Sequence, residues 1–264
     1  MFFKYLQSLF LELRFAISFL TLLPVSPKAK LDEKIISDSL AFFPFAALFF
    51  SLLSAGFIYL NTFIDNQLVL AFLIISSHAL LSGGLHLDAV MDSHDGLACS
   101  DRARDEIVRV MKDSRAGAFA VIALFFTLSA QLIFISQADY SSSLYLYLLI
   151  LVPVLSRIFM VLELVFFVNP KKLDVKSSLL TFVQVSKFKA LILGSLVILA
   201  LVYFYPHTKI CILVFVFIAL VFSILFYRFL NYKLKGQNGD SIGCGLVVNE
   251  VFMYLLIFVF SNLS

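Results

Sequence analysis

The sequence predicts an all-α, polytopic membrane protein with about seven transmembrane helices and an N-terminal amphipathic helix on the membrane surface. Three observations predict this class: 61% of the 264 residues are hydrophobic, only 14% are charged, and the mean hydropathy is +1.01. Soluble domains contain roughly 45–50% apolar and about 25% charged residues. A chain of this length cannot bury so much apolar surface in one water-facing core. The sequence therefore excludes a soluble globular protein.

The charges give no indication of a nucleic-acid partner. The net charge of +3 comes from 20 Lys and Arg against 17 Asp and Glu, spread along the chain. Nucleic-acid-binding proteins concentrate basic residues on one face instead. We therefore expect the lipid bilayer to be the main surroundings. The Phe-rich faces can pack against lipid or against another protomer, so a homo-oligomer is also an open possibility.

Residues 1–23 have the pattern of an amphipathic helix. Apolar residues from Phe3 to Leu20 recur every three or four positions, and Pro24 ends the segment. We expect this helix to lie on the membrane surface and, with its connector, to form a first domain over 1–34. We expect residues 35–264 to form a second, transmembrane domain. The alternative is that the first segment is an imperfect transmembrane span.

Seven later apolar runs are long enough to cross the bilayer. A hydrocarbon core of about 30 Å requires roughly 20 helical residues. The predicted spans occupy residues 39–60, 68–86, 117–137, 143–168, 190–206, 210–230 and 246–262.

The connections between these spans alternate in basic charge. Lys and Arg gather in residues 1–34 and in the longer connections, and are nearly absent from the short ones. The positive-inside rule therefore predicts that the N-terminus and three loops face the cytoplasm. These loops lie near 87–116, 169–189 and 231–245.

Three carboxylates follow the second predicted span. Asp88, Asp92 and Asp95 are spaced i, i+4 and i+7, which places them on one face of a helix. Three like charges near a low-dielectric region repel one another unless a cation neutralises them. Oxygen ligands of this kind suit Mg²⁺, with Mn²⁺ as a second possibility. The alternative is a solvated helix end without a ligand.

Other polar residues near these acids are typical of phosphate binding. Lys112 and Arg115 bring cations to the same end of the membrane, and guanidinium groups bind phosphate oxygens in a bidentate manner. Gly96 would allow a diphosphate to approach the backbone closely. His86 could contact phosphate or metal, although a single histidine near a membrane boundary is more often structural.

Further ionisable residues lie outside this cluster. Asp240 belongs to a glycine-rich connection that could hold phosphate or supply another metal ligand. Arg157 and Glu250 lie inside predicted spans, where ionisable residues usually face a cavity or each other. We assign these two, with His86, to substrate binding.

Several of these motifs resemble the signature of the cobalamin synthase family, the adenosylcobinamide-GDP ribazoletransferases. The resemblance is carried by GGLHLD and the acids that follow it up to Gly96, and by MKDSRAGAF. It extends along the chain through FLTLLPV, FP, SR and GDSIG. These motifs occupy residues 83–96, 111–119, 19–25, 43–44, 156–157 and 239–243.

The resembling pattern also differs from this chain near the C-terminus. Lys235 and Asn238 stand where the family pattern has glycine and threonine, and Val247 stands at the first of two glutamate positions. Only Glu250 remains of that glutamate pair.

The resemblance implies the reaction of adenosylcobinamide-GDP with α-ribazole or its 5′-phosphate, giving adenosylcobalamin or its phosphate and GMP. It implies a transferase of the bacterial cytoplasmic membrane whose active site faces the cytoplasm. On this basis we expect the three aspartates to hold Mg²⁺ and Lys112 and Arg115 to hold the diphosphate. Either Asp113 or Asp240 would accept the proton of the attacking hydroxyl group.

Three other functions use similar residues. CDP-alcohol phosphotransferases and prenyltransferases also bind Mg²⁺ through clustered acids, but at spacings that this chain lacks. A transporter would place its polar groups near the membrane midplane in repeated halves, and no repeat of the aspartate cluster occurs here.

Overall fold

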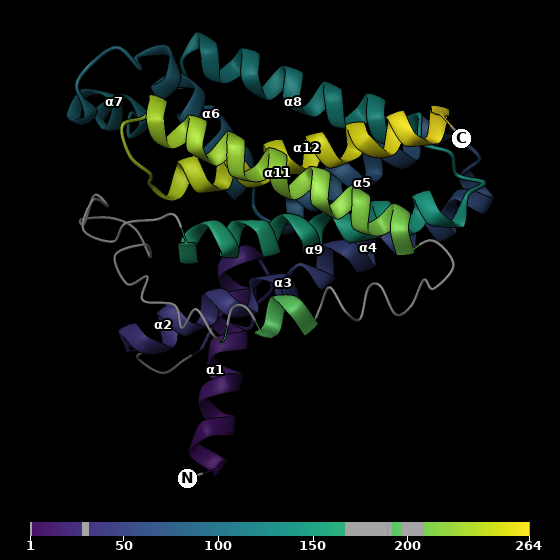
Figure 1. Ribbon diagram of the computed structural model, residues 1–264, viewed down its shortest axis with the longest axis horizontal. Coiled ribbons are helices and arrows are strands. Elements are labelled where there is room, and N and C mark those ends of the chain that lie inside the picture. Colours follow the sequence, from purple (N-terminus) through teal and green to yellow (C-terminus); the bar gives the residue numbers. More distant parts are fainter. Residues whose placement is uncertain (1, 28–31, 167–188, 190–191, 197–208, 264) are drawn as a thin grey trace.

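The described part of the protein is helical throughout its regular structure. The computed structural model describes residues 2–27, 32–166, 189, 192–196 and 209–263, and no strand occurs within these ranges. This confirms the predicted all-α class. In Figure 1 the long helices α8, α9, α11 and α12 run side by side, with α6 and α7 at one end of the bundle. The helices are α1 (Phe2–Leu20), α2 (Glu33–Ser39), η1 (Leu40–Phe42), α3 (Phe43–Ala46), α4 (Leu48–Ile64), α5 (Gln67–Leu81), α6 (Leu85–Ala98), α7 (Arg104–Met111), α8 (Ala118–Ser136), α9 (Ser143–Phe166), α11 (Lys209–Lys233) and α12 (Gly239–Leu263).

Five helical segments in the described residues are long and apolar enough to cross a membrane. They are Glu33–Asn61, which joins α2 to α4, and the helices α8, α9, α11 and α12. A bent pair formed by α5 and α6 would make a sixth. The polytopic prediction is confirmed. Of the predicted span over 190–206, only residues 192–196 lie inside the described part, where they are helical.

The predicted span over 68–86 is wrong, because the helix breaks before its end. The axes of α5 and α6 are bent by 87°. At the break, Gly83 and Gly84 have φ values of 62° and 76°, a left-handed conformation that favours glycine. The backbone N–H of Leu22 donates to the carbonyl of Leu81 at 2.7 Å, so the segment after α1 is attached to this bend. His86 and the aspartates therefore lie on a separate helix that packs chiefly against α12 and α8.

The loop predicted over 231–245 is shorter than expected. The last helix, α12, begins at Gly239, and Asn238 caps it by accepting the Ser241 N–H at 2.8 Å. Asp240 therefore lies in the first turn of a helix and has a fixed position.

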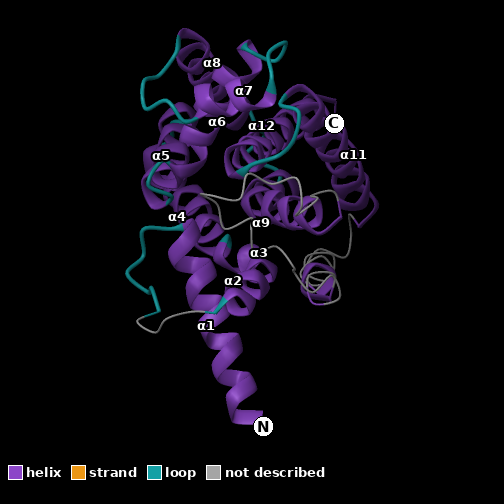
Figure 2. Ribbon diagram, turned by 90° about the vertical axis from the view of Figure 1, so that its left-hand side faces the viewer, coloured by secondary structure: helices purple, strands orange, loops and turns teal. Residues whose placement is uncertain are grey.

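The N-terminal segment forms the predicted helix, which ends at Leu20. Figures 1 and 2 show α1 projecting from the bundle. Its first half exposes Phe3 and Phe10, whereas Leu20 is fully buried and the second half packs against α2 and α3. The domain boundary predicted at residue 34 falls inside α2. The location of α1 on the membrane surface stays a prediction.

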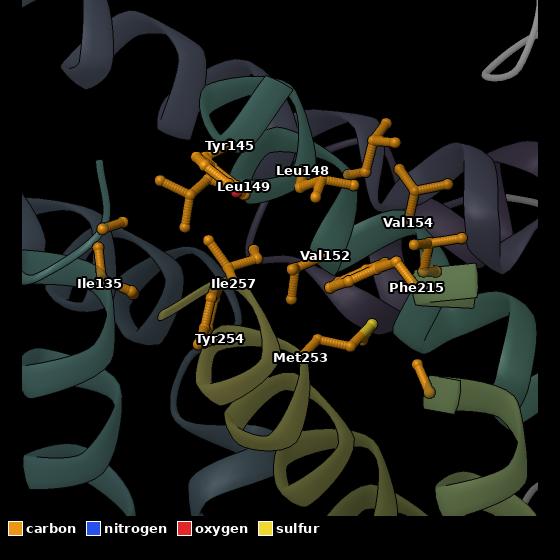
Figure 3. Close-up of a cluster of buried hydrophobic side chains, with 14 of the residues drawn as sticks. Ile135, Tyr145, Leu148, Leu149, Val152, Val154, Phe215, Met253, Tyr254 and Ile257 are labelled. Atoms are coloured by element: carbon orange, nitrogen blue, oxygen red, sulfur yellow. The ribbon is translucent and has the colours of Figure 1, made fainter. Parts of the chain in front are cut away.

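The centre of the bundle is α9, whose residues are mostly buried. Its apolar side chains meet those of α11 and α12 in the cluster of Figure 3. The labelled residues of this cluster are Ile135, Tyr145, Leu148, Leu149, Val152, Val154, Phe215, Met253, Tyr254 and Ile257.

A buried ion pair connects α9 to α12. The guanidinium group of Arg157 pairs with the carboxylate of Glu250, and the Arg157 side chain is only 2% exposed. Ser156 Oγ donates to Glu250 Oε1 at 2.9 Å, and the guanidinium lies 4.7 Å from the ring centroid of Phe50. Each charge is therefore compensated by groups that can reach it only in the folded bundle.

Removing one partner of this pair is expected to destabilise the protein strongly. Arg157→Leu would leave the Glu250 carboxylate buried without its cation, at a cost of about 3–5 kcal/mol. The double variant Arg157→Leu/Glu250→Leu should recover most of that loss. Unfolding in lipid nanodiscs measures both. Equal stability of the single and double variants would contradict this account.

Candidate active site

An acidic cavity of about 490 Å³ lies where α6, α7 and the start of α12 meet. Its lining residues come from distant parts of the sequence, since Asp88 and Asp240 are 152 positions apart. Seven of the predicted site residues line it: Asp88, Asp92, Asp95, Lys112, Asp113, Arg115 and Asp240. The structure therefore brings these seven residues together, and the other four predicted site residues, His86, Gly96, Arg157 and Glu250, do not line this cavity.

The carboxylates of this cavity are close enough to perturb one another. Asp92 lies on α6, outside the five helices that can cross the membrane. Burial, followed by the negative charges of Asp88, Asp240 and Asp95, raises the pKa of Asp92 from 3.8 to about 7. Four carboxylates are therefore close enough to repel one another at this wall of the cavity, and a bound cation would relieve that repulsion.

Asp95 has a role beyond the one predicted for it. Its Oδ2 accepts the backbone N–H of Gly117 at 2.7 Å, and its Oδ1 accepts that of Ala120 at 2.9 Å. Both oxygens therefore satisfy the exposed N–H groups at the start of α8. A Cβ atom at Gly117 would lie 2.5 Å from Asp95 Oδ1, so a side chain there would displace the Asp95 carboxylate. Its carboxylate thus has a structural role at the start of α8, and its role as a metal ligand stays a prediction.

The three aspartates that the sequence predicted as metal ligands do not form a complete metal site by themselves. In the described residues, no three carboxylate, imidazole or thiol groups converge closely enough to hold an ion by themselves. Asp88 and Asp92 remain one helical turn apart on the cavity wall, with Asp240 facing the same space from α12.

Asp113 is paired with Arg115 instead of being available as a base. Arg115 Nη2 lies 2.7 Å from Asp113 Oδ2, and Arg115 Nε donates to Oδ1 at 3.0 Å. These hydrogen bonds from Arg115 lower the pKa of Asp113 to about 2. A carboxylate that binds protons so weakly is a poor general base. Of the two acids that the sequence left open, the geometry favours Asp240.

Gly96 does not face the acidic cavity. A Cβ atom at this position would lie 2.7 Å from Cγ of Met111 and 3.2 Å from Cδ2 of Leu234. The glycine therefore allows α6 to pack closely against α7 and the end of α11. The prediction that it admits a diphosphate is wrong.

His86, Arg157 and Glu250 lie away from the acidic cavity. They line a separate interior cavity of about 40 Å³, which His78 and Gln131 also line. The ion pair of Arg157 and Glu250 faces this small space, so the prediction that these two residues bind substrate is corrected to a role inside the bundle. His86 also lines a third cavity, which is apolar.

The turn between α11 and α12 explains two departures from the resembling pattern. Lys235 has a φ of 55°, a conformation in which glycine is favoured, and its Nζ donates to the carbonyls of Asp101 and Arg102. Asn238 caps α12, a role that asparagine and threonine share. Asn238 Nδ2 also donates to Asp240 Oδ2 at 3.5 Å. This contact was missed from the sequence, although an asparagine immediately before a helix is a recognisable capping signal.

The fold and this cavity define an integral membrane protein that gathers carboxylates and cations at one end of a helical bundle, a combination suited to phosphate-bearing substrates. The family model described as Cobalamin-5-phosphate synthase matches residues 12–258. The chain belongs to this family, which confirms the resemblance found in the motifs.

Two curated relatives match nearly the whole chain at modest sequence identity, and a third matches part of it. The adenosylcobinamide-GDP ribazoletransferase of Clostridioides difficile strain 630 is 27% identical over 253 residues, covering 92% of this chain and 97% of that protein. The one from Caldanaerobacter subterraneus subsp. tengcongensis is 28% identical, covering 94% of this chain and 96% of that protein. The one from Desulforamulus reducens is 35% identical over 156 residues, covering 59% of this chain and 61% of that protein. No solved structure matches the chain.

Asp95 and Gly117 are expected to act together on stability. Asp95→Ala would leave two backbone N–H groups at the start of α8 without their acceptor, at a cost of about 1–3 kcal/mol. Gly117→Ala should cost a similar amount because its methyl group would displace the Asp95 carboxylate. Thermal unfolding in nanodiscs measures both variants. Asp92→Asn is the matched control and should not lower stability, since it removes a repelled charge; additive losses in Asp95→Ala/Gly117→Ala would contradict the shared contact.

Proposed function

We propose that this protein is an adenosylcobinamide-GDP ribazoletransferase, which joins adenosylcobinamide-GDP to α-ribazole or its 5′-phosphate and releases GMP. The observation that carries the proposal is the acidic cavity, in which acids and cations from α6, the α7–α8 connection and α12 meet. The family match over residues 12–258 and the names of the relatives support it.

Mg²⁺ is the proposed cofactor of this cavity. Asp88 and Asp92 would hold the ion, since Mg²⁺ is usually bound through one or two carboxylates, with substrate phosphate oxygens and water completing its coordination. The raised pKa of Asp92 supports this assignment because part of the shift comes from the neighbouring carboxylates of Asp88, Asp240 and Asp95, whose repulsion a cation would relieve. When bound, the ion would neutralise charge on the diphosphate and on the leaving GMP.

Lys112 and Arg115 are proposed to hold the diphosphate. Both line the cavity, and Lys112 ends α7, where the chain turns toward α8. Arg115 lies at the rim, and its side chain is 88% exposed, so it can exchange its contact with Asp113 for a phosphate group. Cations at these two positions would orient the phosphorus atom toward the acceptor.

Asp240 is proposed as the general base. The hydroxyl oxygen of the ribazole ribose forms a bond to the phosphorus atom that carries the corrinoid. The bond between that phosphorus and the bridging oxygen breaks, and the bridging oxygen leaves with GMP. Asp240 accepts the hydroxyl proton, and the Asn238 amide orients its carboxylate.

The cavity is proposed to face the cytoplasm of a bacterial cell, in the cytoplasmic membrane. The basic connections that include α7 and the α11–α12 turn lie at the same end of the bundle as the cavity (Figure 1). Basic residues of this kind are retained on the cytoplasmic side.

Asp92→Asn is expected to lower the rate of GMP release roughly a hundredfold or more, because it removes a metal-binding carboxylate without changing the side-chain size. Purified protein in nanodiscs, supplied with adenosylcobinamide-GDP and α-ribazole, provides the assay. Asp101→Asn, an exposed position outside the cavity, is the matched control. Turnover of CDP-diacylglycerol or a prenyl diphosphate by the wild-type protein, without turnover of the corrinoid, would contradict the proposed function.

The affinity for Mg²⁺ is expected to depend on pH. Protons compete with the metal for a carboxylate whose pKa is about 7. Affinity should therefore be constant above that pH and fall about tenfold for each unit below it, for competition by one proton. Calorimetric titration with MgCl₂ measures this. Asp113 will not contribute, since its pKa is about 2; an affinity that stays constant through neutral pH would contradict the role of Asp92.

A further inference from the structure

A third cavity lies beside the acidic cavity and differs from it in chemistry. It encloses about 280 Å³ and shares Gly239 and Asp240 with the acidic cavity. Its other walls come from the end of α1, from η1 and α3, from α6 and from α9. Among the lining residues are Phe19, Phe43, Leu85, His86 and Leu164.

The composition of this cavity excludes the charged part of a substrate. Asp240 is the only carboxylate on its wall, and no lysine or arginine lines it among the described residues. A diphosphate or a metal ion would therefore lack partners here. The volume is roughly nine times the 30 Å³ or so that one water molecule occupies, which is room for a bicyclic ring system.

Two features of the wall suit a flat aromatic ring with a polar edge. The rings of Phe19 and Phe43 are stacked, with centroids 5.7 Å apart and planes inclined by 19°. His86 is only 8% exposed, and its Nε2 has no hydrogen-bond partner in the described part of the chain. A buried polar nitrogen without a partner is costly, and a ring nitrogen of a ligand would satisfy it.

The position of Asp240 relates the two cavities to the reaction. An acceptor that gives its hydroxyl proton to Asp240 has its nucleophilic oxygen at the junction of the cavities. The acidic cavity is required for the diphosphate, so the remainder of the acceptor has to extend into the apolar cavity. We infer that this cavity binds the benzimidazole ring of the ribazole acceptor, between the aromatic wall and His86. This inference rests on the proposed function.

Gly239 supports this arrangement from the backbone. A Cβ atom built at Gly239 meets nothing within 4 Å, so the space at the junction is open. The ribose that links an aromatic ring to the reacting hydroxyl would pass through this opening. The acyl chain of a lipid is the competing occupant, but it would leave the buried Nε2 of His86 facing hydrocarbon without a hydrogen-bond partner among the described residues.

The first test narrows the cavity. Leu164 is 3% exposed on α9, and Leu164→Trp would replace its aliphatic side chain with a bulky indole ring inside the apolar cavity. We expect the KM for α-ribazole to rise about tenfold or more, while the KM for adenosylcobinamide-GDP stays unchanged. Leu225→Trp, on α11 where the side chain is 60% exposed, is the matched control and should change neither value.

The second test enlarges the cavity and does not depend on the first variant folding. Leu85 is 40% exposed at the start of α6, so Leu85→Ala is mild for the fold. It should raise severalfold the ratio of kcat/KM for a naphthimidazole riboside over that for α-ribazole, a specificity change that a purely structural effect would not produce.

The outcomes separate the inference from the proposed function. Unchanged KM for α-ribazole in Leu164→Trp and an unchanged base preference in Leu85→Ala, with wild-type GMP release intact, would overturn the inference. So would a co-purified lipid chain that α-ribazole does not displace. Wild-type protein that releases no GMP from the two substrates together would contradict the proposed function instead.

Discussion

The carboxylate of Asp95 holds the start of α8 against α6, and the acidic cavity depends on this contact. One aspartate of the cluster is used to attach two helices, which orients the same face of α6 toward the α7–α8 connection. The two aspartates that precede it then line a space that basic residues also border. A charge that stabilises a helix N-terminus therefore also positions the carboxylates that line the acidic cavity.

Much of the fold could be predicted from hydropathy, because a helix that faces lipid must be apolar over a defined length. The segments that became α8, α9 and α11 follow that rule directly. The bend between α5 and α6 does not, because hydropathy stays high across Gly83 and Gly84 while the backbone turns. The early start of α12 was also missed, since its first residues are polar and look like a loop.

The site could be predicted in its members but not in their roles. Spacing along one helix showed that Asp88, Asp92 and Asp95 share a face, yet it could not show that the start of α8 would occupy the third. The same limit applies to Gly96, where a small residue between helices and one beside a ligand look alike in sequence. Arg157 and Glu250 line a different cavity from the aspartates, and their sequence positions inside predicted spans did not show which cavity they would face.

The bend after α5 also has a consequence for the surrounding lipid. With 15 residues, α5 extends only about 22 Å, which is less than the roughly 30 Å of an average hydrocarbon core. If α5 crosses the membrane, the bilayer beside it has to thin locally to match this length. Such thinning would bring the headgroup region closer to the start of α6. A large amphiphilic corrinoid could then approach the reacting end of the bundle along the membrane surface, without either leaving the interface or entering the acyl chains.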